Sequence, residues 1–361
     1  MDKRITVIKG DGVGGEIVVE AVKVIDKIAR KYGHVMSYNY QLMGGAALDE
    51  YGIPLPMETI DACRESDAVL LGGVGDPKWD FSPQHLRPKT GLLNLRMSLG
   101  LFANIRPVKL HPALISACPL KNSEQKIDMI IVRELTSGIY FGERRTFTDE
   151  EGYKTAYDTM KYNDYEISRV ARLALELGRK RGKGVISIDK ANALDSSKLW
   201  REIIQQVRGS DYLDVPLYDL LVDEAVTELI RDPSQFDVVV AENLFGDILS
   251  NGAGILTGSP GMLPSASLGS SGFGLYEPVH GSLPDIAGRD VANPLAMILS
   301  AALMMRLSLS MVDEAANIED AVERVLKRGY RTADIVCKEE LNDSITVVGC
   351  KMMGDLVASE I

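Results

Sequence analysis

The sequence predicts an α/β fold in which helices cover both faces of a mainly parallel sheet. Short apolar runs typical of buried strands alternate with amphipathic stretches typical of helices. Three of these runs, which end at Val132, Ile188 and Ala241, are followed closely by polar side chains suited to chemistry. Because ligands of open α/β sheets bind outside the carboxyl ends of the strands, the sequence also predicts an active site at that edge.

Composition and charge narrow the class of protein. The chain has 361 residues, of which 45% are hydrophobic and 25% charged, and this is enough for two hydrophobic cores. Its formal net charge of −11 argues against nucleic acid or an anionic membrane as a main partner. Residues 1–4 lead into a strand pattern without a signal peptide, and the apolar stretch 295–305 is too short to span a bilayer. The four cysteines lack zinc-type spacing and suit a reducing compartment, so we expect a cytoplasmic protein.

The expected elements follow this alternation along the chain. The expected strands are residues 5–8, 35–41, 68–71, 129–132, 185–188 and 238–241. The expected helices are residues 15–32, 91–96, 166–181, 294–307 and 313–328. Gly182 or Gly184 is suited to end the helix over 166–181, whose last turn is basic. Residues 263–274 are rich in Gly, Ser and Pro, and residues 277–293 are expected to form a loop.

Residues 141–163 differ from their surroundings. They are rich in Tyr, Thr, Asp and Lys but poor in aliphatic side chains, so they cannot bury a core of their own. The segment is either a loose excursion or an arm that needs a partner chain. We expect an arm, because its Tyr and Thr content suits a small intermolecular sheet.

Residues 10–15 match the pattern G-x-G-x-x-G, follow a strand and open a helix. The dinucleotide-binding fingerprint also requires an acidic residue at the end of the second strand. The second strand here ends in Gln41, followed by Leu42, Met43 and Gly44. A tight turn between strand and helix explains the glycines at least as well, so we do not predict a Rossmann domain.

Three arginines are candidates for binding an anionic substrate. Arg96 lies in an expected helix, Arg106 follows the run 101–105, and Arg133 follows the strand over 129–132. Taken singly, each is more often part of a surface ion pair. Brought together at strand ends, their planar forks suit a substrate with two carboxylates.

Asp247 and Asn251 are four residues apart at a helix start, so both project from one face. Asp223 would add a third oxygen ligand, and an oxygen-only set indicates Mg²⁺ or Mn²⁺. The alternative is helix capping by Asp247 beside an unrelated surface acid, and spacing alone favours that alternative.

Lys190 stands at a strand end and is a candidate general base, which requires a lowered pKa. Tyr140 is a candidate acid. Asp285 lies in the patterned loop 277–288, where its carboxylate would accept from both hydroxyls of an adenosine ribose and repel a 2′-phosphate. Taken alone, Lys190 or Tyr140 is more often structural.

These residues lie in motifs that resemble the β-decarboxylating dehydrogenases of the isocitrate/isopropylmalate family. The resemblance extends from Val7 to about Leu356. It is carried by residues 10–14, 75–80, 87–96, 101–107, 132–136, 138–142, 189–192, 243–251, 263–267 and 277–288.

The resemblance implies a two-domain α/β fold with a large mixed sheet, different from the Rossmann fold. One domain would comprise residues 1–103 and 258–361, with both termini and the NAD loop. The other would comprise residues 104–257, with the dimer interface and the arm at 141–163. The implied assembly is a homodimer with shared active sites.

The resemblance also implies roles for individual residues. Tyr140 would be the acid and Lys190 the base, and Lys190 and Asp223 would reach the active site of the neighbouring subunit. The implied substrate-binding residues are Leu92, Arg96, Arg106, Arg133 and Asp223. The implied metal ligands are Asp223, Asp247 and Asn251. The implied NAD-binding residues are Gly281, Ser282, Pro284, Asp285, Ile286 and Asn293.

The implied activity is NAD-dependent oxidative decarboxylation of (2R,3S)-3-isopropylmalate to 2-oxoisocaproate with Mg²⁺ or Mn²⁺, as in leucine biosynthesis. Leu92 favours an alkyl side chain on the substrate over a third carboxylate. The sequence departs from the family pattern at Lys9, Lys89, Ala193 and Asn251. These departures leave open a paralogue for D-malate, tartrate or homoisocitrate, or a non-catalytic subunit of the same fold.

Overall fold

The computed structural model describes residues 1–120, 126–337 and 344–361. The chain divides into two compact units. Unit 1 comprises Met1–Leu101, Lys109–Gln125 and Gly254–Ile361, and unit 2 comprises Phe102–Val108 and Lys126–Ala253. Ten strands form a mixed sheet, and five of them belong to each unit. In the described part of the chain, no helix is both long and apolar enough to cross a membrane.

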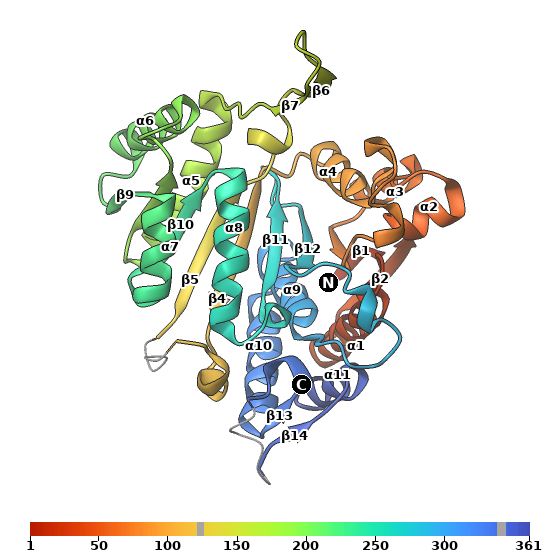
Figure 1. Cartoon of the computed structure of the whole chain (residues 1–361). Helices are drawn as coiled ribbons and strands as arrows, with labels where there is room; N and C mark the ends of the chain where they lie inside the picture. Colours follow the sequence, from red (N-terminus) through yellow and green to blue (C-terminus); the bar gives the residue numbers. More distant parts are fainter. Residues whose placement is uncertain (121–125, 338–343) are drawn as a thin grey trace. The chain divides into compact units, whose positions relative to one another are not determined.

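Unit 1 contains the strands in the order β2-β1-β3-β12-β11 (Figure 1). β1 pairs in parallel with β2 and β3, β12 in parallel with β3, and β11 runs antiparallel to β12. The bounds of these strands are β1 Asp2–Ile8, β2 Val35–Gln41, β3 Ala68–Leu71, β11 Pro264–Leu268 and β12 Gly274–Pro278. A separate pair consists of β13 (Tyr330–Arg331) and β14 (Thr346–Val347), which run parallel.

The helices of unit 1 pack on its sheet and on one another. Their bounds are α1 Gly14–Tyr32, α2 Gly45–Tyr51, α3 Met57–Arg64, α4 Pro88–Ser98, α9 Leu295–Leu307, α10 Val312–Lys327 and α11 Cys350–Ser359. α9 is apolar almost all round, because it packs against β11 and β12 on one side and against α1 and α10 on others. α1 is amphipathic and ends at Gly33, whose φ of 70° is the left-handed conformation that favours glycine.

Unit 2 contains the strands in the order β4-β5-β10-β8-β9, with β5, β10, β8 and β9 mutually parallel (Figure 1). The bounds are β4 Ala103–Lys109, β5 Asp128–Glu134, β8 Val185–Asp189, β9 Leu217–Leu221 and β10 Val238–Ala241. The helices are α5 Asp164–Arg181, α6 Asp195–Asp211, α7 Val222–Arg231 and α8 Asn243–Gly254. α5 begins with a capping box of Asn163 and Glu166 and ends at Gly182.

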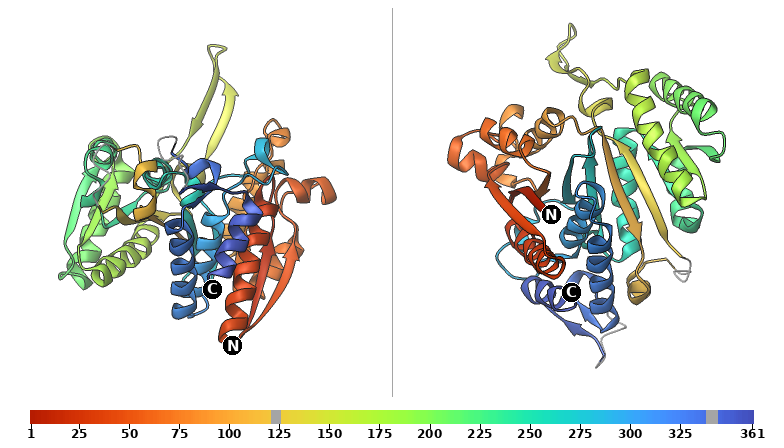
Figure 2. Two further views of the ribbon diagram at one scale, coloured as in Figure 1. Left: turned by 90° about the horizontal axis from the view of Figure 1, so that it is seen from below. Right: turned by 180° about the vertical axis from the view of Figure 1, so that it is seen from behind.

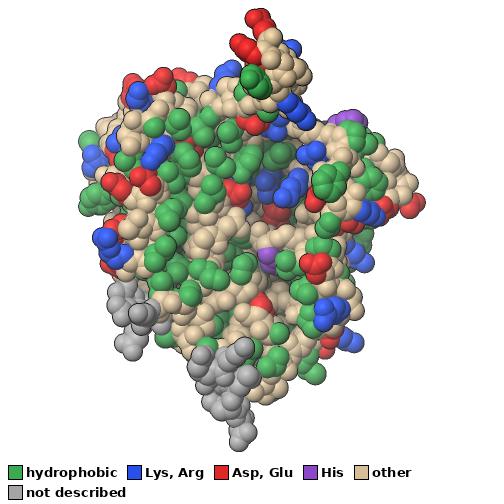
Figure 3. Space-filling model, in the orientation of Figure 1, with side chains coloured by type: hydrophobic (Ala, Val, Ile, Leu, Met, Phe, Trp, Pro, Cys, Tyr) green, Lys and Arg blue, Asp and Glu red, His purple; other side chains and the backbone are tan. Residues whose placement is uncertain are grey.

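Helices cover both faces of the unit 2 sheet. Val238 and Val240 of β10 belong to one core with Trp200 and the apolar side of α5 and α6. Because side chains alternate along a strand, Val239 faces the other way, where α7 and α8 pack. The outer surface of these two helices is apolar as well (Figure 3), since Val226, Ile230 and Ile248 are 41%, 63% and 55% exposed.

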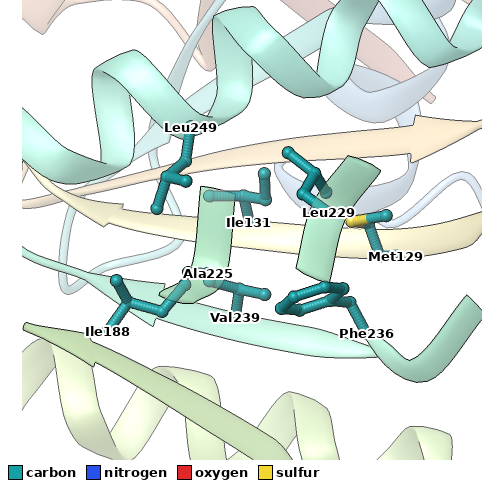
Figure 4. A pocket seen from close by; sticks show the side chains of 8 residues that line it. All are labelled: Met129, Ile131, Ile188, Ala225, Leu229, Phe236, Val239 and Leu249. Carbon is teal, nitrogen blue, oxygen red and sulfur yellow. The ribbon is translucent and has the colours of Figure 1, made fainter. Parts of the chain in front are cut away.

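Under α7 and α8 lies a small apolar cavity of about 10 Å³ (Figure 4). Its lining comes from β5, β8, β10, both helices and the segment before β10. The residues are Met129, Ile131, Ile188, Ala225, Leu229, Phe236, Val239 and Leu249. The cavity is no larger than one water molecule and its lining is apolar, so this is an ordinary packing gap rather than a ligand site.

The predicted arm contains an antiparallel hairpin. Its strands are β6 (Arg144–Thr148) and β7 (Lys154–Asp158), which pair with each other and, among the described residues, with no further strand (Figure 1 and Figure 2). Most of its side chains are exposed. An isolated two-stranded hairpin is marginally stable in water, so this segment is suited to pairing with a further surface.

Two details of the expected elements are wrong. The Gly/Ser/Pro-rich stretch contains β11 and the start of β12, where we expected no strand. Arg106 and Arg133 lie inside β4 and β5 rather than after them, because both strands run further than their apolar runs.

Candidate functional site

Asp247, in the second turn of α8, is the centre of a polar cluster in unit 2. Arg133 Nη1 forms an ion pair with Asp247 Oδ1, and Arg106 Nη1 lies 3.3 Å from the same oxygen. The hydroxyl of Tyr140 lies 3.4 Å from Asp247 Oδ2. The structure therefore brings together two of the three predicted arginines, the predicted acid and one predicted metal ligand.

The fold positions this cluster through neighbouring parallel strands. Arg133 of β5 is in register with Ala241 of β10, and α8 begins two residues after β10 ends. The start of α8 therefore lies beside Arg133. Gly246 of α8 is in close contact with Arg133, since a Cβ there would lie 2.9 Å from the Arg133 Cβ. Only glycine permits this approach of helix and arginine.

The guanidinium of Arg106 is fixed by neutral partners. Its Nε donates to Asn104 Oδ1 at 2.7 Å, and its Nη1 donates to Ser250 Oγ at 2.6 Å. Both Arg106 and Arg133 are about 95% buried. Buried arginines held in one orientation are suited to bidentate binding of carboxylates.

Tyr140 ends the short helix η4 (Gly138–Tyr140), and its ring lies under the guanidinium of Arg133, 5.7 Å from centroid to Cζ. Burial, followed by the charge of Asp247, raises the pKa of the Tyr140 hydroxyl. The hydroxyl therefore carries its proton throughout the neutral range, as an acid must.

Lys190 and Asp223 form a second group in unit 2. β8 and β9 are adjacent and parallel, with Asp189 opposite Leu221, so the residues that follow both strands leave the sheet side by side. Lys190 Nζ forms an ion pair with Asp223 Oδ1, and this hydrogen bond lowers the pKa of the exposed Asp223 carboxyl. Within the chain, the predicted base is thus paired with a predicted metal ligand.

Asn251 lies one turn beyond Asp247, as the spacing predicts. Its Nδ2 donates to the backbone oxygen of Asp247 at 2.8 Å, and this bond does not use the amide oxygen. Within the described residues, no cluster of three or more His, Cys, Asp or Glu side chains is arranged to hold a metal. Asp247 and Asn251 lie one turn apart on α8, and the third predicted ligand, Asp223, pairs with Lys190.

Arg96 of α4 lies in unit 1, where it forms a buried ion pair with Glu277 of β12 at 2.5 Å. Its Nε is buried without a hydrogen-bond partner in the described structure. An unpaired buried donor is costly, and a ligand carboxylate would satisfy it. Leu92, on the same helix, is half-buried.

A larger hollow, of about 210 Å³, lies in unit 1 beside the predicted NAD loop. Its lining includes the predicted residues Ile286 and Asn293. The other lining residues are Ser259, Pro260, Gly261, His280, Leu283, Val291, Ala292 and Asp334. Burial lowers the pKa of His280, so its ring is neutral. The site combines apolar walls with a few fixed polar groups, as ligand sites generally do.

The other predicted loop residues are close in the sequence to residues that line this hollow. Pro284, Asp285 and Ile286 form a short 3₁₀ helix, and Asp285 is exposed. Asn293 accepts from Leu295 N, at the start of α9, at 3.0 Å and donates to Asp334 Oδ2 at 3.1 Å.

The glycine-rich turn packs against this loop instead of forming an open cradle. Val13 N donates to the backbone oxygen of Ser282 at 2.8 Å, and a Cβ on Gly12 would lie 2.1 Å from that oxygen. Gly281 is exposed on the same loop. Asp11 accepts from Gly45 N, Ala46 N and Gly75 N at 2.8–3.0 Å. These contacts support the interpretation of residues 10–15 as a structural turn.

Sequence reasoning did not single out Asn243, His280 or Asp334. Asn243 accepts from Arg133 Nε at 2.9 Å, and His280 and Asp334 line the hollow of unit 1. Asn243 follows β10 by two residues, so the rule of strand ends would have found it. Nothing local in the sequence marks Asp334, which is 41 residues from Asn293.

Comparisons with known proteins agree with these observations. Residues 4–357 match the family described as isocitrate/isopropylmalate dehydrogenase. The chain is 52% identical over 363 residues to the 3-isopropylmalate dehydrogenase of Oleidesulfovibrio alaskensis, with all of both chains covered. It is 55% identical over 333 residues to that of Geobacillus kaustophilus, with 92% of this chain and 90% of the relative covered.

Among solved structures, the isocitrate dehydrogenase of Methylococcus capsulatus superposes with a TM-score of 0.87 at 31% identity, covering 99% of each chain. The β-decarboxylating dehydrogenase of Thermococcus kodakarensis gives 0.78 at 31% identity, covering 99% of this chain and 96% of the other. These matches confirm the predicted α/β fold class with its large mixed sheet. The chain belongs to the isocitrate/isopropylmalate dehydrogenase family.

Proposed function

We propose that this protein catalyses the NAD-dependent oxidative decarboxylation of 3-isopropylmalate to 2-oxoisocaproate, the reaction of leucine biosynthesis. Relatives that span the whole chain at about half identity carry the name of this activity. The observation that carries the proposal is the cluster in unit 2, where Arg106, Arg133 and Tyr140 gather at Asp247. An anion-binding pair beside a protonated acid suits a dicarboxylic substrate that must be protonated after it loses CO₂.

The arginines bind the two carboxylates in this proposal. Arg106 and Arg133 are buried and oriented by fixed partners, so they lose little freedom on binding. The buried Nε of Arg96 supplies a donor that is still without a partner in the described structure. Leu92, on the same helix as Arg96, provides an apolar contact for the isopropyl group and no partner for a third carboxylate.

The divalent metal would be held by oxygen ligands from two chains. Asp247 and Asn251 supply a carboxylate and an amide oxygen, and Asp223 of a second copy supplies the other carboxylate. This donor set suits Mg²⁺ or Mn²⁺, which also takes substrate oxygens. When bound, the metal supplies Lewis-acid stabilisation of the negative charge that develops on the substrate oxygen.

Lys190 and Tyr140 move protons in this proposal. Lys190 of a second copy accepts the proton of the substrate hydroxyl as C2 is oxidised, and bound NAD would supply the hydride acceptor for that oxidation. Tyr140 then donates a proton to the carbon that has lost CO₂, and its raised pKa keeps that proton in place until then. Proton transfer by a positioned side chain is worth about 10²–10⁴-fold in rate.

NAD binds at the hollow of unit 1 in this proposal. Gly281, Ser282 and Pro284 shape the loop, and Ile286 and Asn293 line the hollow. Asp285 is exposed between Leu283 and Ile286, which both line it. Its carboxylate is placed to accept from the two ribose hydroxyls of an adenosine.

The functional unit in this proposal is a homodimer. The apolar outer surface of α7 and α8 exposes Val226, Ile230 and Ile248 together, which is typical of a buried interface (Figure 3). The hairpin β6–β7 offers unpaired strand edges to a second copy. Both features lie in unit 2, which also supplies Lys190 and Asp223.

A substrate panel tests the proposed activity. With NAD and Mn²⁺, we expect kcat/KM for 3-isopropylmalate to exceed that for D-malate, tartrate and homoisocitrate at least tenfold. An alkyl group that is fully buried contributes about 1–3 kcal/mol, which is the reason for this margin. Faster turnover of D-malate would contradict the proposed substrate. No turnover of any of the acids by folded protein would favour a non-catalytic subunit.

The variant Asp285→Ser tests the cofactor assignment. Removing the carboxylate removes an acceptor for the ribose of NAD and the repulsion of the 2′-phosphate of NADP. We expect the ratio of kcat/KM for NAD over NADP to fall at least tenfold, with the KM for 3-isopropylmalate unchanged. Asp313→Ser, at an exposed acid of α10, is the matched control. An unchanged preference would count against the role of Asp285.

A further inference from the structure

Asn243, the first residue of α8, is a buried polar residue to which the function proposed above gives no role. It is 1% exposed. Its Oδ1 accepts from Arg133 Nε at 2.9 Å, and its Nδ2 donates to the backbone oxygen of Ser137 at 2.9 Å. Its backbone N–H donates to the Tyr162 hydroxyl at 2.8 Å. The side chain therefore connects two parts of the site: its acceptor binds Arg133, and its donor binds the turn that precedes Tyr140.

The first of these parts is Arg133 itself. Gly246 lies against the stem of Arg133, and Asp247 pairs with Nη1, so the first turns of α8 contact the arginine along its length. Asn243 holds Nε, which is the inner edge of the guanidinium. A guanidinium fixed at Nε presents its outer nitrogens in one orientation.

The second part is the turn between β5 and Tyr140. Glu134, fully buried, accepts from Thr136 N at 2.8 Å and Ser137 N at 2.9 Å. On the far side of the turn, Gly138 packs on Tyr162, since a Cβ there would lie 2.4 Å from the hydroxyl oxygen. The carbonyl of Ser137, the residue directly before η4, is held by the Asn243 amide.

The chemistry of these bonds selects an amide. Aspartate has nearly the same shape and keeps an acceptor for Arg133, but it cannot donate to the Ser137 carbonyl. Alanine removes both bonds. Serine is too short to span the two partners. Substitutions can therefore remove the contact with Ser137 alone or both contacts together, and the two changes can be measured separately.

We propose that Asn243 is a positioning residue that fixes the carboxylate-binding Arg133 and the proton-donating Tyr140 relative to each other. This inference rests on the roles of Arg133 and Tyr140 given under the proposed function. It assigns the start of α8 a task beyond metal binding, because one amide links the substrate-binding arginine to the turn that carries the acid.

Kinetics of two variants test this inference. Asn243→Asp keeps the acceptor and loses the donor, so we expect kcat for 3-isopropylmalate to fall about 10-fold or more, and KM to stay within about threefold. Asn243→Ala loses both bonds, so we expect the same fall in kcat and a rise of KM by about 10-fold or more. The controls are Asn317→Asp and Asn317→Ala, which make the same changes at a half-buried asparagine whose Nδ2 lies 3.4 Å from the Tyr32 hydroxyl in unit 1.

The outcomes separate this inference from the proposed function. Melting curves first establish that the variants fold. Equal kinetics of both Asn243 variants and the wild type, with Arg133→Ala raising KM, would overturn the inference and leave the proposed function intact. The inference would also be overturned if both variants lost the same share of kcat and neither changed KM, because that result indicates only a smaller amount of active enzyme. An Arg133→Ala variant with unchanged KM would instead contradict the site assignment on which the inference rests.

Discussion

At the scale of single residues, Glu242 shows that a sequence does not reveal whether an acidic side chain is charged in the folded protein. It precedes Asn243 and is fully buried next to the polar cluster. Its Oε1 accepts from Ser197 Oγ at 2.5 Å, and its Oε2 is buried without a partner in the described structure. Burial, with a smaller contribution from the charge of Asp189, raises the pKa of Glu242 to about 7. An acidic residue in a sequence therefore need not be charged in the folded protein.

The raised pKa gives a prediction for stability against pH. Because the folded state holds this proton more tightly than the unfolded state, the contribution of Glu242 to stability falls as pH rises from about 4.5 to about 7. Glu242→Gln removes the buried charge and keeps an acceptor for Ser197. We expect it to raise the free energy of unfolding at pH 8 by about 1–3 kcal/mol and to change it little at pH 5.

Urea denaturation of both proteins at the two pH values measures this difference. Glu202→Gln, at an exposed glutamate that accepts from Gln206 on α6, is the control and should be equal to the wild type at both. A stabilisation of the same size at pH 5 and pH 8 would show that Glu242 does not titrate between them.

Residues at strand ends were the easiest part of the site to predict. Lys190 and Asp247 could be chosen because parallel strands place whatever follows them at one edge of the sheet. Asp223 follows β9, a strand that we did not predict, and the register of β8 with β9 explains why it lies beside Lys190. Arg106 and Arg133 were chosen as candidates, but we did not predict that they lie inside strands. An apolar run indicates only part of a strand that ends in polar residues. Asp334 acts through partners distant in sequence, and a single sequence does not contain that information. Asn243 follows β10 closely enough for the rule of strand ends to reach it, but its partners Arg133 and Ser137 are distant in sequence.

At the scale of elements, β11 and β12 show why local propensity fails. β11 includes Pro264, Ser265, Ala266 and Ser267, residues that favour turns over strands in isolation. They are all buried here, and Ser300 of α9 donates to the Glu277 carbonyl of β12 at 3.0 Å. Small side chains let α9 lie close to the sheet, so the strand is stabilised by the helix that packs on it. Ser265 N also donates to Ser300 Oγ at 3.3 Å, so contacts between residues far apart in the sequence decided the structure of this segment.

α8 illustrates the opposite case, in which spacing in the sequence predicted which residues share one face of a helix. Residues four apart on a helix share a face, and Asp247 and Asn251 do so here. The same face includes Asn243, and Gly246 allows the helix to approach Arg133. One helix thus provides the carboxylate, the amide oxygen and the positioning amide proposed for this site. Sequence spacing predicted the face, and the structure identified its partners.

At the scale of the whole molecule, a single chain contains the parts of the proposed site in separate groups. Lys190 and Asp223 pair with each other, and Asp247 pairs with the arginines. Within the described residues, the carboxylates do not form a three-ligand metal cluster. An isolated chain is therefore short of a metal site in our proposal, and a second copy that contributes Lys190 and Asp223 would complete it.

Complementation between two inactive variants tests this shared site. In Arg133→Ala the substrate-binding arginine is missing, and in Lys190→Ala the base is missing, so each homodimer should be inactive. If each site combines Arg133 of one chain with Lys190 of the other, a mixed dimer has one intact site and one site with both defects. Random pairing makes half of the dimers mixed, so co-refolded chains should regain about a quarter of the wild-type activity. If Arg133 and Lys190 act within the same chain, every site keeps one defect and the mixture stays inactive. Because the outcome depends only on which chain supplies each group, no recovery in dimers shown to be mixed would contradict the shared site while leaving the roles of Arg133 and Lys190 themselves intact.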